Sequence, residues 1–238
     1  MPDNPVIVAL DVGRDEALSL ADSLRGRVRW LKVGMTLYYA EGPEIVARLR
    51  EKGFDVFVDL KLHDIPHQVA GAAASLACLG VGMITVHASG GSAMMRAAVD
   101  GSLKAAEECG LAAPKVLAVT VLTSTSDAGL AEIGVPGTAR EQVRRLAELA
   151  RDAGVDGVVC SPHEAAEVRA LLGGQALVVT PGVRPTWAEA GDQARTSTPS
   201  DALAAGASHL VVGRPITAAP DPAEAASRIL EEIERGRQ

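Results

Sequence analysis

The sequence has few aromatic residues, no excess of basic residues and no long hydrophobic run. Aromatic side chains make up 3% of its 238 residues, too few for a platform on which nucleic-acid bases could stack. The 30 acidic residues outnumber the 23 basic ones and give a net charge of −7, which argues against a general binder of nucleic acid or of membrane surfaces. No apolar stretch reaches the roughly 18 residues that a membrane span requires.

Cysteine is also scarce. Cys78, Cys109 and Cys160 are an odd number and show no CxxC spacing. This pattern argues against a disulfide framework or a thiolate zinc site, and it is typical of a reducing compartment. The first residues lack the basic stretch and apolar run of a secretory signal. We therefore expect a soluble cytoplasmic protein with an aliphatic core.

What the sequence does contain is a repeated short apolar run, rich in Val and Ile. Most of these runs are apolar throughout, as expected for strands that are buried on both faces of a parallel sheet. Stretches with helical spacing lie between them. We expect strands at 6–12, 29–34, 55–62, 83–89, 115–123, 157–161, 176–183 and 209–217, and helices that include 43–53, 139–154 and 222–236.

Several of the helical stretches end in a glycine directly before the next strand. Glycine is the usual residue at this point because it closes a helix in the left-handed conformation. The glycines in question are Gly53, Gly80, Gly110, Gly154 and Gly206.

Eight strand–helix units in this length predict an α/β fold, a closed (β/α)8 TIM barrel, as a single domain over 1–238. Two smaller domains would also be ordinary for the length, and a doubly wound open sheet is the competing architecture. No GxGxxG motif follows the first strand, which weakens the dinucleotide-binding form of the open sheet. In a barrel, catalytic residues gather at the carboxyl ends of the strands.

Charged residues at the end of the third predicted strand are the first candidates for such a site. Within FVDLKLHDIPHQV (57–69), the two-residue period of a strand puts Asp59 and Lys61 on the same face as Phe57. The opposite face is aliphatic and should pack against helices, so Asp59 and Lys61 are predicted to point into the barrel mouth. Lysine can exchange its proton, whereas arginine effectively cannot. A solvated strand end is the alternative interpretation.

The turn after this strand contains further candidates. Asp64 precedes Pro66 and the next predicted helix, where it could serve the site or cap the helix. His63 and His67 have a four-residue spacing that a helix could offer to a metal. Pro66 disfavours a helix across both, so solvated or capping histidines are the favoured interpretation.

The seventh and eighth strands end in TPGVRP (180–185) and VVGRPIT (211–217). Each motif pairs a glycine, which lets an anion approach backbone N–H groups, with an arginine, Arg184 or Arg214, that can bind a phosphate with two hydrogen bonds. Either motif alone is compatible with an ordinary turn. Because barrel enzymes often bind a substrate phosphate at these two loops, the pair predicts a phosphate site.

Together with ALDV, LKVG, VTVLTS and GDQ, these motifs run nearly end to end, and the sequence resembles the orotidine 5′-phosphate decarboxylase family, which makes uridine monophosphate. The resemblance implies that Asp59, Lys61 and Asp64 form a catalytic Asp-Lys-Asp array. It implies a nucleotide substrate and a homodimer in which Asp64 reaches the neighbour's site. The substrate-binding residues that it implies are Asp11 and Lys32 at the ribose, Ser124 at the pyrimidine with Thr123 beside it in the VTVLTS motif, Gln193, Gly213 and Arg214 at the phosphate, and Arg184 in the loop that closes over the phosphate.

The sequence departs from the family in one place. It reads DIPHQ where members commonly read DIPNT, so Gln68 stands at the position of a threonine used near the ribose. Glutamine offers both a donor and an acceptor, so we expect Gln68 to make the contact with a different geometry.

The chemistry that the resemblance implies also suits the residues. Loss of carbon dioxide from C6 of orotidylate leaves a carbanion, which an ammonium at Lys61 can stabilise and then protonate. We expect no cofactor and no metal. The alternatives are a magnesium-dependent sugar-phosphate decarboxylase of the 3-keto-L-gulonate 6-phosphate type, which shares the Asp-x-Lys-x-x-Asp array, and a non-catalytic nucleotide-phosphate sensor.

Overall fold

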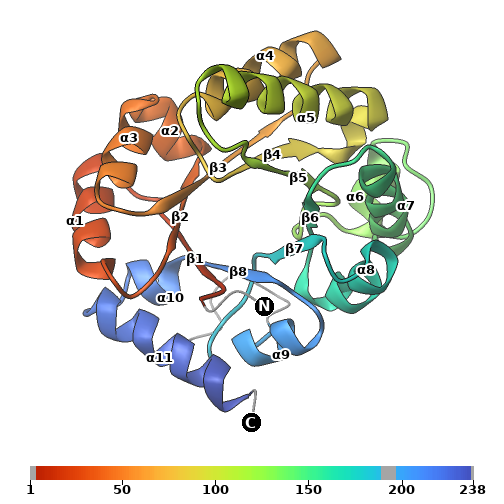
Figure 1. Ribbon diagram of the computed structural model, residues 1–238. Coiled ribbons are helices and arrows are strands. Elements are labelled where there is room, and N and C mark those ends of the chain that lie inside the picture. The colour runs from red at the N-terminus through yellow and green to blue at the C-terminus, as the bar shows by residue number, and fades with distance from the viewer. Residues whose placement is uncertain (1–3, 189–196, 237–238) are drawn as a thin grey trace.

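A closed barrel of parallel strands forms the centre of the molecule (Figure 1). The computed structural model describes residues 4–188 and 197–236. Each strand pairs with its neighbours in the chain, and β1 pairs with β8, with Val6 opposite Leu210, so the predicted barrel is confirmed. The strands are β1 (Val6–Ala9), β2 (Trp30–Gly34), β3 (Asp55–Leu62), β4 (Met83–His87), β5 (Lys115–Val119), β6 (Gly157–Val159), β7 (Leu177–Thr180) and β8 (His209–Val212).

Helices surround the barrel (Figure 1). None of those within residues 4–188 and 197–236 combines the length and the apolar character needed to cross a membrane. The five glycines predicted to close helices all have positive φ, between 65° and 104°. The helices are α1 (Arg14–Leu24), α2 (Met35–Glu41), α3 (Glu44–Glu51), α4 (Pro66–Ala77), α5 (Gly91–Glu108), α6 (Asp127–Glu132), α7 (Ala139–Asp152), α8 (Ala165–Leu172), α9 (Pro199–Ala204), α10 (Arg214–Thr217) and α11 (Pro222–Arg235), with short 3-10 turns η1 (Ala88–Gly90) and η2 (Pro162–Glu164).

The strands bury side chains on both faces, as their apolar character predicts. One face packs against the helices and forms the larger core, which includes Val8, Val58 and Ile84. The other face fills the barrel interior, and Phe57, only 1% exposed, is its largest fully buried side chain. The interior residues are Ile7, Ala9, Phe57, Met83, Leu117, Val179 and Val211.

Two rings lie together where β2 and β8 begin, at the amino end of the barrel. The rings of Trp30 and His209 meet edge to face with their centroids 6.2 Å apart. Gly82 leaves room for the tryptophan, because a Cβ at that position would lie 2.5 Å from the Trp30 ring. Burial, together with the positive charge of Arg29, lowers the pKa of His209 to about 4. The imidazole is therefore neutral at physiological pH.

A disulfide joins Cys78 and Cys109, and the expectation from the cysteine pattern is wrong on this point. The two residues cap the carboxyl ends of α4 and α5. These neighbouring helices pack closely, since a Cβ at Gly101 would lie 2.6 Å from the Ala70 carbonyl oxygen. The two caps consequently approach to a Cα–Cα distance of 5.8 Å. A separation of 31 residues gave no sign of this proximity. Cys160 is a buried free thiol.

Candidate active site

The carboxyl ends of the strands surround a cavity of about 590 Å³. Its wall combines apolar residues from inside the barrel, such as Phe57 and Val211, with most of the polar residues predicted from the sequence. Gln193 lies outside the described residues. The predicted residues that line the cavity are Asp11, Lys32, Asp59, Lys61, Thr123, Ser124, Arg184, Gly213 and Arg214.

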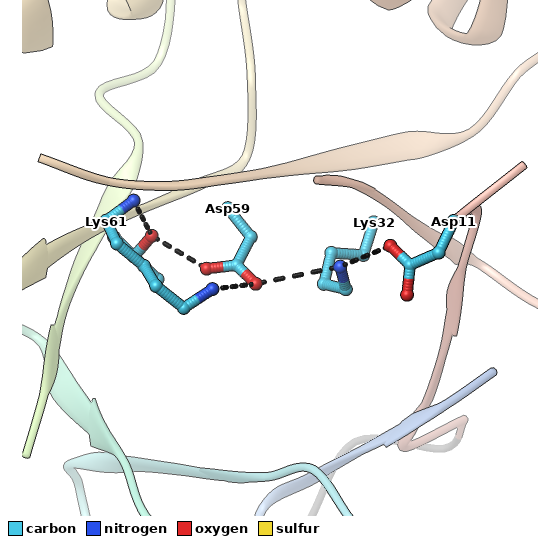
Figure 2. A network of polar contacts seen from close by, with 5 residues as sticks. Asp11, Lys32, Asp59 and Lys61 are labelled. Carbon is cyan, nitrogen blue, oxygen red and sulfur yellow. Dashed lines mark hydrogen bonds and ion pairs between the residues drawn. The ribbon is translucent and has the colours of Figure 1, made fainter. Parts of the chain in front are cut away.

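Four of these residues form a row of alternating charge across the first three strands (Figure 2). Lys61 Nζ lies 2.9 Å from Asp59 Oδ2, and Lys32 Nζ lies 3.6 Å from the same oxygen. Lys32 Nζ also donates to Asp11 Oδ1 at 3.2 Å. The row therefore holds two ammonium groups and two carboxylates, and the outer carboxylate, that of Asp11, is the most exposed of the four.

Asp59 is the centre of this row, and its side chain is 13% exposed. Burial alone would raise the pKa of Asp59, because it disfavours the charged form. The positive charges of Lys32 and Lys61, with hydrogen bonds from Lys61 and Thr85, act in the opposite direction and outweigh burial, so the pKa of Asp59 is lowered. Asp59 is consequently a carboxylate at neutral pH, partly buried beside two cations.

Lys61 is held in an uncommon backbone conformation. Its φ is +53°, in the left-handed region, and it is the only residue other than glycine with positive φ in the described part of the chain. The pairing of β3 with β4 shifts register between Val58 and Leu62, around this residue. The predicted orientation of Asp59 and Lys61 into the mouth is confirmed, although Lys61 reaches it from an irregular strand end.

Thr85 on β4 holds both Asp59 and Lys61, and it was not among the predicted site residues. The Lys61 backbone N–H donates to Thr85 Oγ1 at 2.9 Å, and Thr85 Oγ1 donates to Asp59 Oδ1 at 2.9 Å. Thr85 is 1% exposed. The sequence does contain a pattern that could have indicated Thr85. It is a polar residue in the middle of an apolar strand, on the same face as Met83, which points into the barrel.

Gly34, the last residue of β2, leaves room for the side chains of Asp11 and Lys32. A Cβ at this position would lie 3.0 Å from Asp11 Oδ1 and 3.1 Å from Lys32 Nζ. Any larger residue would press directly on the ion pair between Asp11 and Lys32. The glycine of the LKVG motif is thus explained by the close approach of two charged side chains.

The loops that follow β7 and β8 form another part of the cavity wall, and β8 pairs with β1. Arg184 follows β7, and its backbone N–H donates to the Ser197 carbonyl at 3.0 Å. Gly213 and Arg214 follow β8 directly, and Arg214 begins α10. Both arginines line the same cavity as the lysine–aspartate row. An elongated anionic ligand could therefore contact guanidinium groups at one end and ammonium groups at the other.

The turn after β3 is not part of the cavity wall. Asp64 is exposed, and its Oδ1 accepts a hydrogen bond from the Ile65 backbone N–H at 2.6 Å. It does not cap α4, since Ile65 holds the N-cap position. Gln68 is exposed on the first turn of α4. Within one chain, Asp64 and Gln68 therefore do not line the cavity with the other predicted site residues.

The histidines of the same turn do not form a metal site. The His63 ring lies with its centroid 5.3 Å from that of His87 at the end of β4, rather than beside His67. Burial, and then electrostatic interactions with His63 and Lys61, lower the pKa of His87. Among the described residues, no group of three or more His, Cys, Asp or Glu side chains is arranged to hold a metal ion.

Known proteins share this sequence and architecture over nearly the full length. Orotidine 5′-phosphate decarboxylase from Paramagnetospirillum magneticum is 51% identical to this chain, over 97% of this chain and 98% of its own length. Orotidine 5′-phosphate decarboxylase from Alkalilimnicola ehrlichii is 53% identical, over 98% of this chain and 97% of its own length. The crystal structure of orotidine 5′-phosphate decarboxylase from Lactobacillus acidophilus superimposes with a TM-score of 0.86 at 42% identity, covering 97% of this chain and 99% of that one.

A second crystal structure, of an uncharacterized conserved protein from Geobacillus kaustophilus, superimposes with a TM-score of 0.84 at 41% identity, covering 96% of this chain and 100% of that one. The model of the orotidine 5′-phosphate decarboxylase / HUMPS family matches residues 4–229, which include every strand of the barrel and the charged row at its mouth. This chain belongs to the orotidine 5′-phosphate decarboxylase / HUMPS family.

Proposed function

We propose that this chain converts orotidine 5′-phosphate to uridine 5′-monophosphate and carbon dioxide, the last step of de novo pyrimidine biosynthesis, without a cofactor. The observation that carries the proposal is the partly buried Asp59–Lys61 pair, with its 2.9 Å contact, in a cavity that two arginines also line. The names of the similar proteins support the same reaction. The chain then acts as a single cytoplasmic domain over 1–238.

Lys61 is the proposed acid. When the bond between C6 and the carboxylate breaks, carbon dioxide leaves and the electron pair stays on C6. The Lys61 ammonium stabilises that charge as it develops, and then transfers a proton from Nζ to C6. Lys61 is left neutral and regains its proton from solvent. The 2.9 Å contact between Lys61 Nζ and Asp59 Oδ2 supports this role, because it fixes the position of the ammonium group in the cavity.

Asp59 is proposed to act on the carboxylate that is lost. It lies beside Lys61 and is partly buried and ionised, so a substrate carboxylate bound next to the ammonium would be close to a second negative charge. That repulsion is relieved when neutral carbon dioxide departs, while the attraction between the ammonium and C6 grows. Thr85 holds Asp59 through Oδ1 and leaves Oδ2 directed at the two lysines.

The remaining cavity residues are proposed to hold the substrate. Asp11 and Lys32 suit the ribose hydroxyls, since they offer an acceptor and a donor at the edge of the row. Thr123 and Ser124 follow β5 and offer hydroxyls to the pyrimidine. The phosphate would contact Arg184, Arg214 and the backbone at Gly213, with Gln193 assigned to it from the sequence alone. This remote binding energy can be used to order the site before the bond breaks.

We further propose a homodimer that completes each site with Asp64 from the partner. Asp64 is exposed, outside the cavity wall of its own chain. Large apolar side chains are also exposed within three residues of the carboxyl ends of three strands, namely Met35, Ile65 and Leu122, at 46%, 63% and 43%. Such a rim around the mouth suits contact with a second copy.

A spectroscopic assay tests the reaction. Purified protein is mixed with orotidine 5′-phosphate and the ultraviolet absorbance of the orotate ring is followed, with and without EDTA. We expect rapid loss of absorbance that is unaffected by EDTA. The name of the family also covers HUMPS members, so no turnover of orotidylate together with EDTA-sensitive decarboxylation of 3-keto-L-gulonate 6-phosphate would favour a magnesium-dependent sugar-phosphate enzyme. Binding of uridine 5′-monophosphate without turnover of orotidylate would instead favour a nucleotide-phosphate sensor.

A further inference from the structure

The chain just after Arg184 rests on the last helix, α11. The backbone N–H and the Oγ1 hydroxyl of Thr186 both donate to Glu232 Oε2, at 3.4 Å each. The Arg228 guanidinium lies over the face of the Trp187 ring, with its Cζ 4.3 Å from the ring centroid. Glu232 and Arg228 stand one helical turn apart on α11, so together they form a socket for Thr186 and Trp187.

The same short stretch is fixed at its other end. Val183 forms a bridge with Ser197, and the Arg184 backbone N–H donates to the Ser197 carbonyl at 3.0 Å. Arg184 therefore lies between two attachments, Ser197 on one side and the α11 socket on the other. Arg184 lines the cavity, whereas Trp187, Arg228 and Glu232 do not.

The tryptophan is held by its ring and not by its N–H group. Within the described residues, Trp187 Nε1 is buried without a hydrogen-bond partner, and so is Glu232 Oε1. The ring packs on the edge of the main core and under Arg228. Cation–π attraction and apolar contact need only an aromatic face, so phenylalanine should preserve the attachment and alanine should not.

We propose that Trp187 is a positioning residue, which docks residues 183–187 on α11 and so fixes where Arg184 presents its guanidinium to the substrate phosphate. The inference rests on the proposed phosphate-binding role of Arg184. Without the attachment, the Arg184 side chain has to be ordered each time that substrate binds, and this ordering costs free energy. Only substrates that carry a phosphate should bind more weakly as a result, because only they use Arg184. Misplacement of a binding group by about 1 Å can cost up to about 100-fold in rate.

The experiment compares two substrates, orotidine 5′-phosphate and phosphate-free orotidine, through the ratio of their kcat/KM values. Trp187→Ala should lower this ratio by roughly ten- to a hundredfold, because only the phosphorylated substrate uses Arg184. Arg228→Ala, which removes an exposed side chain and leaves the core intact, should lower it several-fold. Trp187→Phe should stay within about threefold of the wild type. Arg235→Ala on the same helix is the matched control and should leave the ratio unchanged, since its Nε contacts only the Glu231 carbonyl among the described residues.

Arg184→Ala separates failure of this inference from failure of the proposed function. If Arg184→Ala lowers the ratio but Trp187→Ala and Arg228→Ala do not, the positioning role of Trp187 is overturned and the phosphate role of Arg184 stands. If Trp187→Ala reduces kcat/KM equally for both substrates, Trp187 is only structural. If Arg184→Ala itself leaves the ratio unchanged, the assigned phosphate role fails, and the positioning role fails with it.

Discussion

At the scale of single residues, the backbone of Lys61 is the most informative feature. A lysine in the left-handed region costs of order 1–3 kcal/mol unless its surroundings fix it, and such strain gathers at functional sites. Here the hydrogen bond from the Lys61 N–H to Thr85 Oγ1 and the register shift of β3 against β4 fix it. The result is an ammonium directed at Asp59 from the end of a strand, held by the neighbouring strand.

Lys61→Ala should reduce turnover of orotidylate by at least about a thousandfold, because a proton donor and an electrostatic stabiliser are lost together. Binding of uridine 5′-monophosphate should change little, since that ligand has no carboxylate at C6. Lys61→Arg should be nearly as inactive, because guanidinium holds its proton too tightly. Lys104→Ala, at a lysine that is 79% exposed, is the control. Steady-state kinetics and calorimetry check both expectations, and near-normal turnover in Lys61→Ala would remove the proton-donor role.

Arg214→Ala should weaken the binding of uridine 5′-monophosphate by about 1.5–3 kcal/mol, the cost of one lost hydrogen bond to a charged group, or roughly 10- to 150-fold in Kd. Uridine, which lacks the phosphate, should bind wild type and variant alike. Arg144→Ala, on the exposed face of α7, is the matched control. A similar loss for uridine would contradict the assignment of Arg214 to the phosphate.

The buried imidazole of His209 should make stability fall in mild acid. Its pKa is about 4 in the folded protein against 6.5 for an ordinary histidine, so the unfolded chain takes up a proton first as the pH falls. The contribution is complete above pH 6.5, decreases between pH 6.5 and about 4, and amounts to about 3 kcal/mol at roughly 1.4 kcal/mol per pH unit.

Urea unfolding between pH 4 and pH 7 checks this expectation. His209→Gln should show a shallower dependence of unfolding free energy on pH than the wild type, and His163→Gln, at an exposed position, should not. An unchanged slope in His209→Gln would mean that other groups cause the acid sensitivity.

At the scale of helices and strands, the sequence predicts most of the fold, because buried parallel strands and amphipathic helices have distinct periods. The predicted strand at 209–217 nevertheless ends at Val212 and the one at 115–123 at Val119. In both, the apolar pattern continues past the strand, into a loop after β5 and into α10 after β8, because residues there line the cavity, as Val121 and Pro215 do. An apolar pattern indicates which residues are buried, and residues at the barrel mouth can be buried in the cavity wall as well as in the sheet. The pattern alone therefore does not show where a strand ends.

The parts of the site that depend on the alternation of side chains along one strand could be predicted from the sequence. The parts that depend on the register between neighbouring strands could not. Alternation along β3 was enough to direct Asp59 and Lys61 inward. The left-handed turn at Lys61 and its bond to Thr85 arise from how β3 and β4 pair, which a single sequence does not contain. The disulfide between Cys78 and Cys109 was missed for the same reason, since it depends on how closely two helices pack.

That disulfide should stabilise the pair α4–α5 without affecting catalysis. Closing a loop of 31 residues contributes about 3 to 4 kcal/mol by the loop-entropy estimate. Cys109→Ser should therefore lower the melting temperature by several degrees and make it insensitive to dithiothreitol, whereas reduction should destabilise the wild type by the same amount. Turnover should be unchanged, because the bond lies at the carboxyl ends of the helices, away from the mouth. An equal response of both proteins to dithiothreitol would show that the bond does not form in solution.

At the scale of the whole molecule, the proposed dimer can be tested by mixing two inactive variants. If Asp64 serves the partner's site, a dimer of one Lys61→Ala and one Asp64→Ala chain has one site with both changes and one site with neither. With random exchange about half of the dimers are mixed, so about a quarter of all sites should regain activity. Activity of the mixture over time, with exchange followed by mass spectrometry of labelled chains, checks this. Continued inactivity despite exchange would assign Asp64 to its own chain.

The pairing of β1 with β8 also determines when the barrel can close during synthesis of the chain. Val6 pairs with Leu210, so one edge of β1 stays open until nearly the whole chain has left the ribosome. At 5–20 residues per second, the interval is roughly 10 to 40 s. The strands that carry Asp59 and Lys61 can pair early in that time, while the incomplete barrel still exposes two unpaired edges. Nascent chains of this protein should therefore depend on chaperones until the last strand arrives.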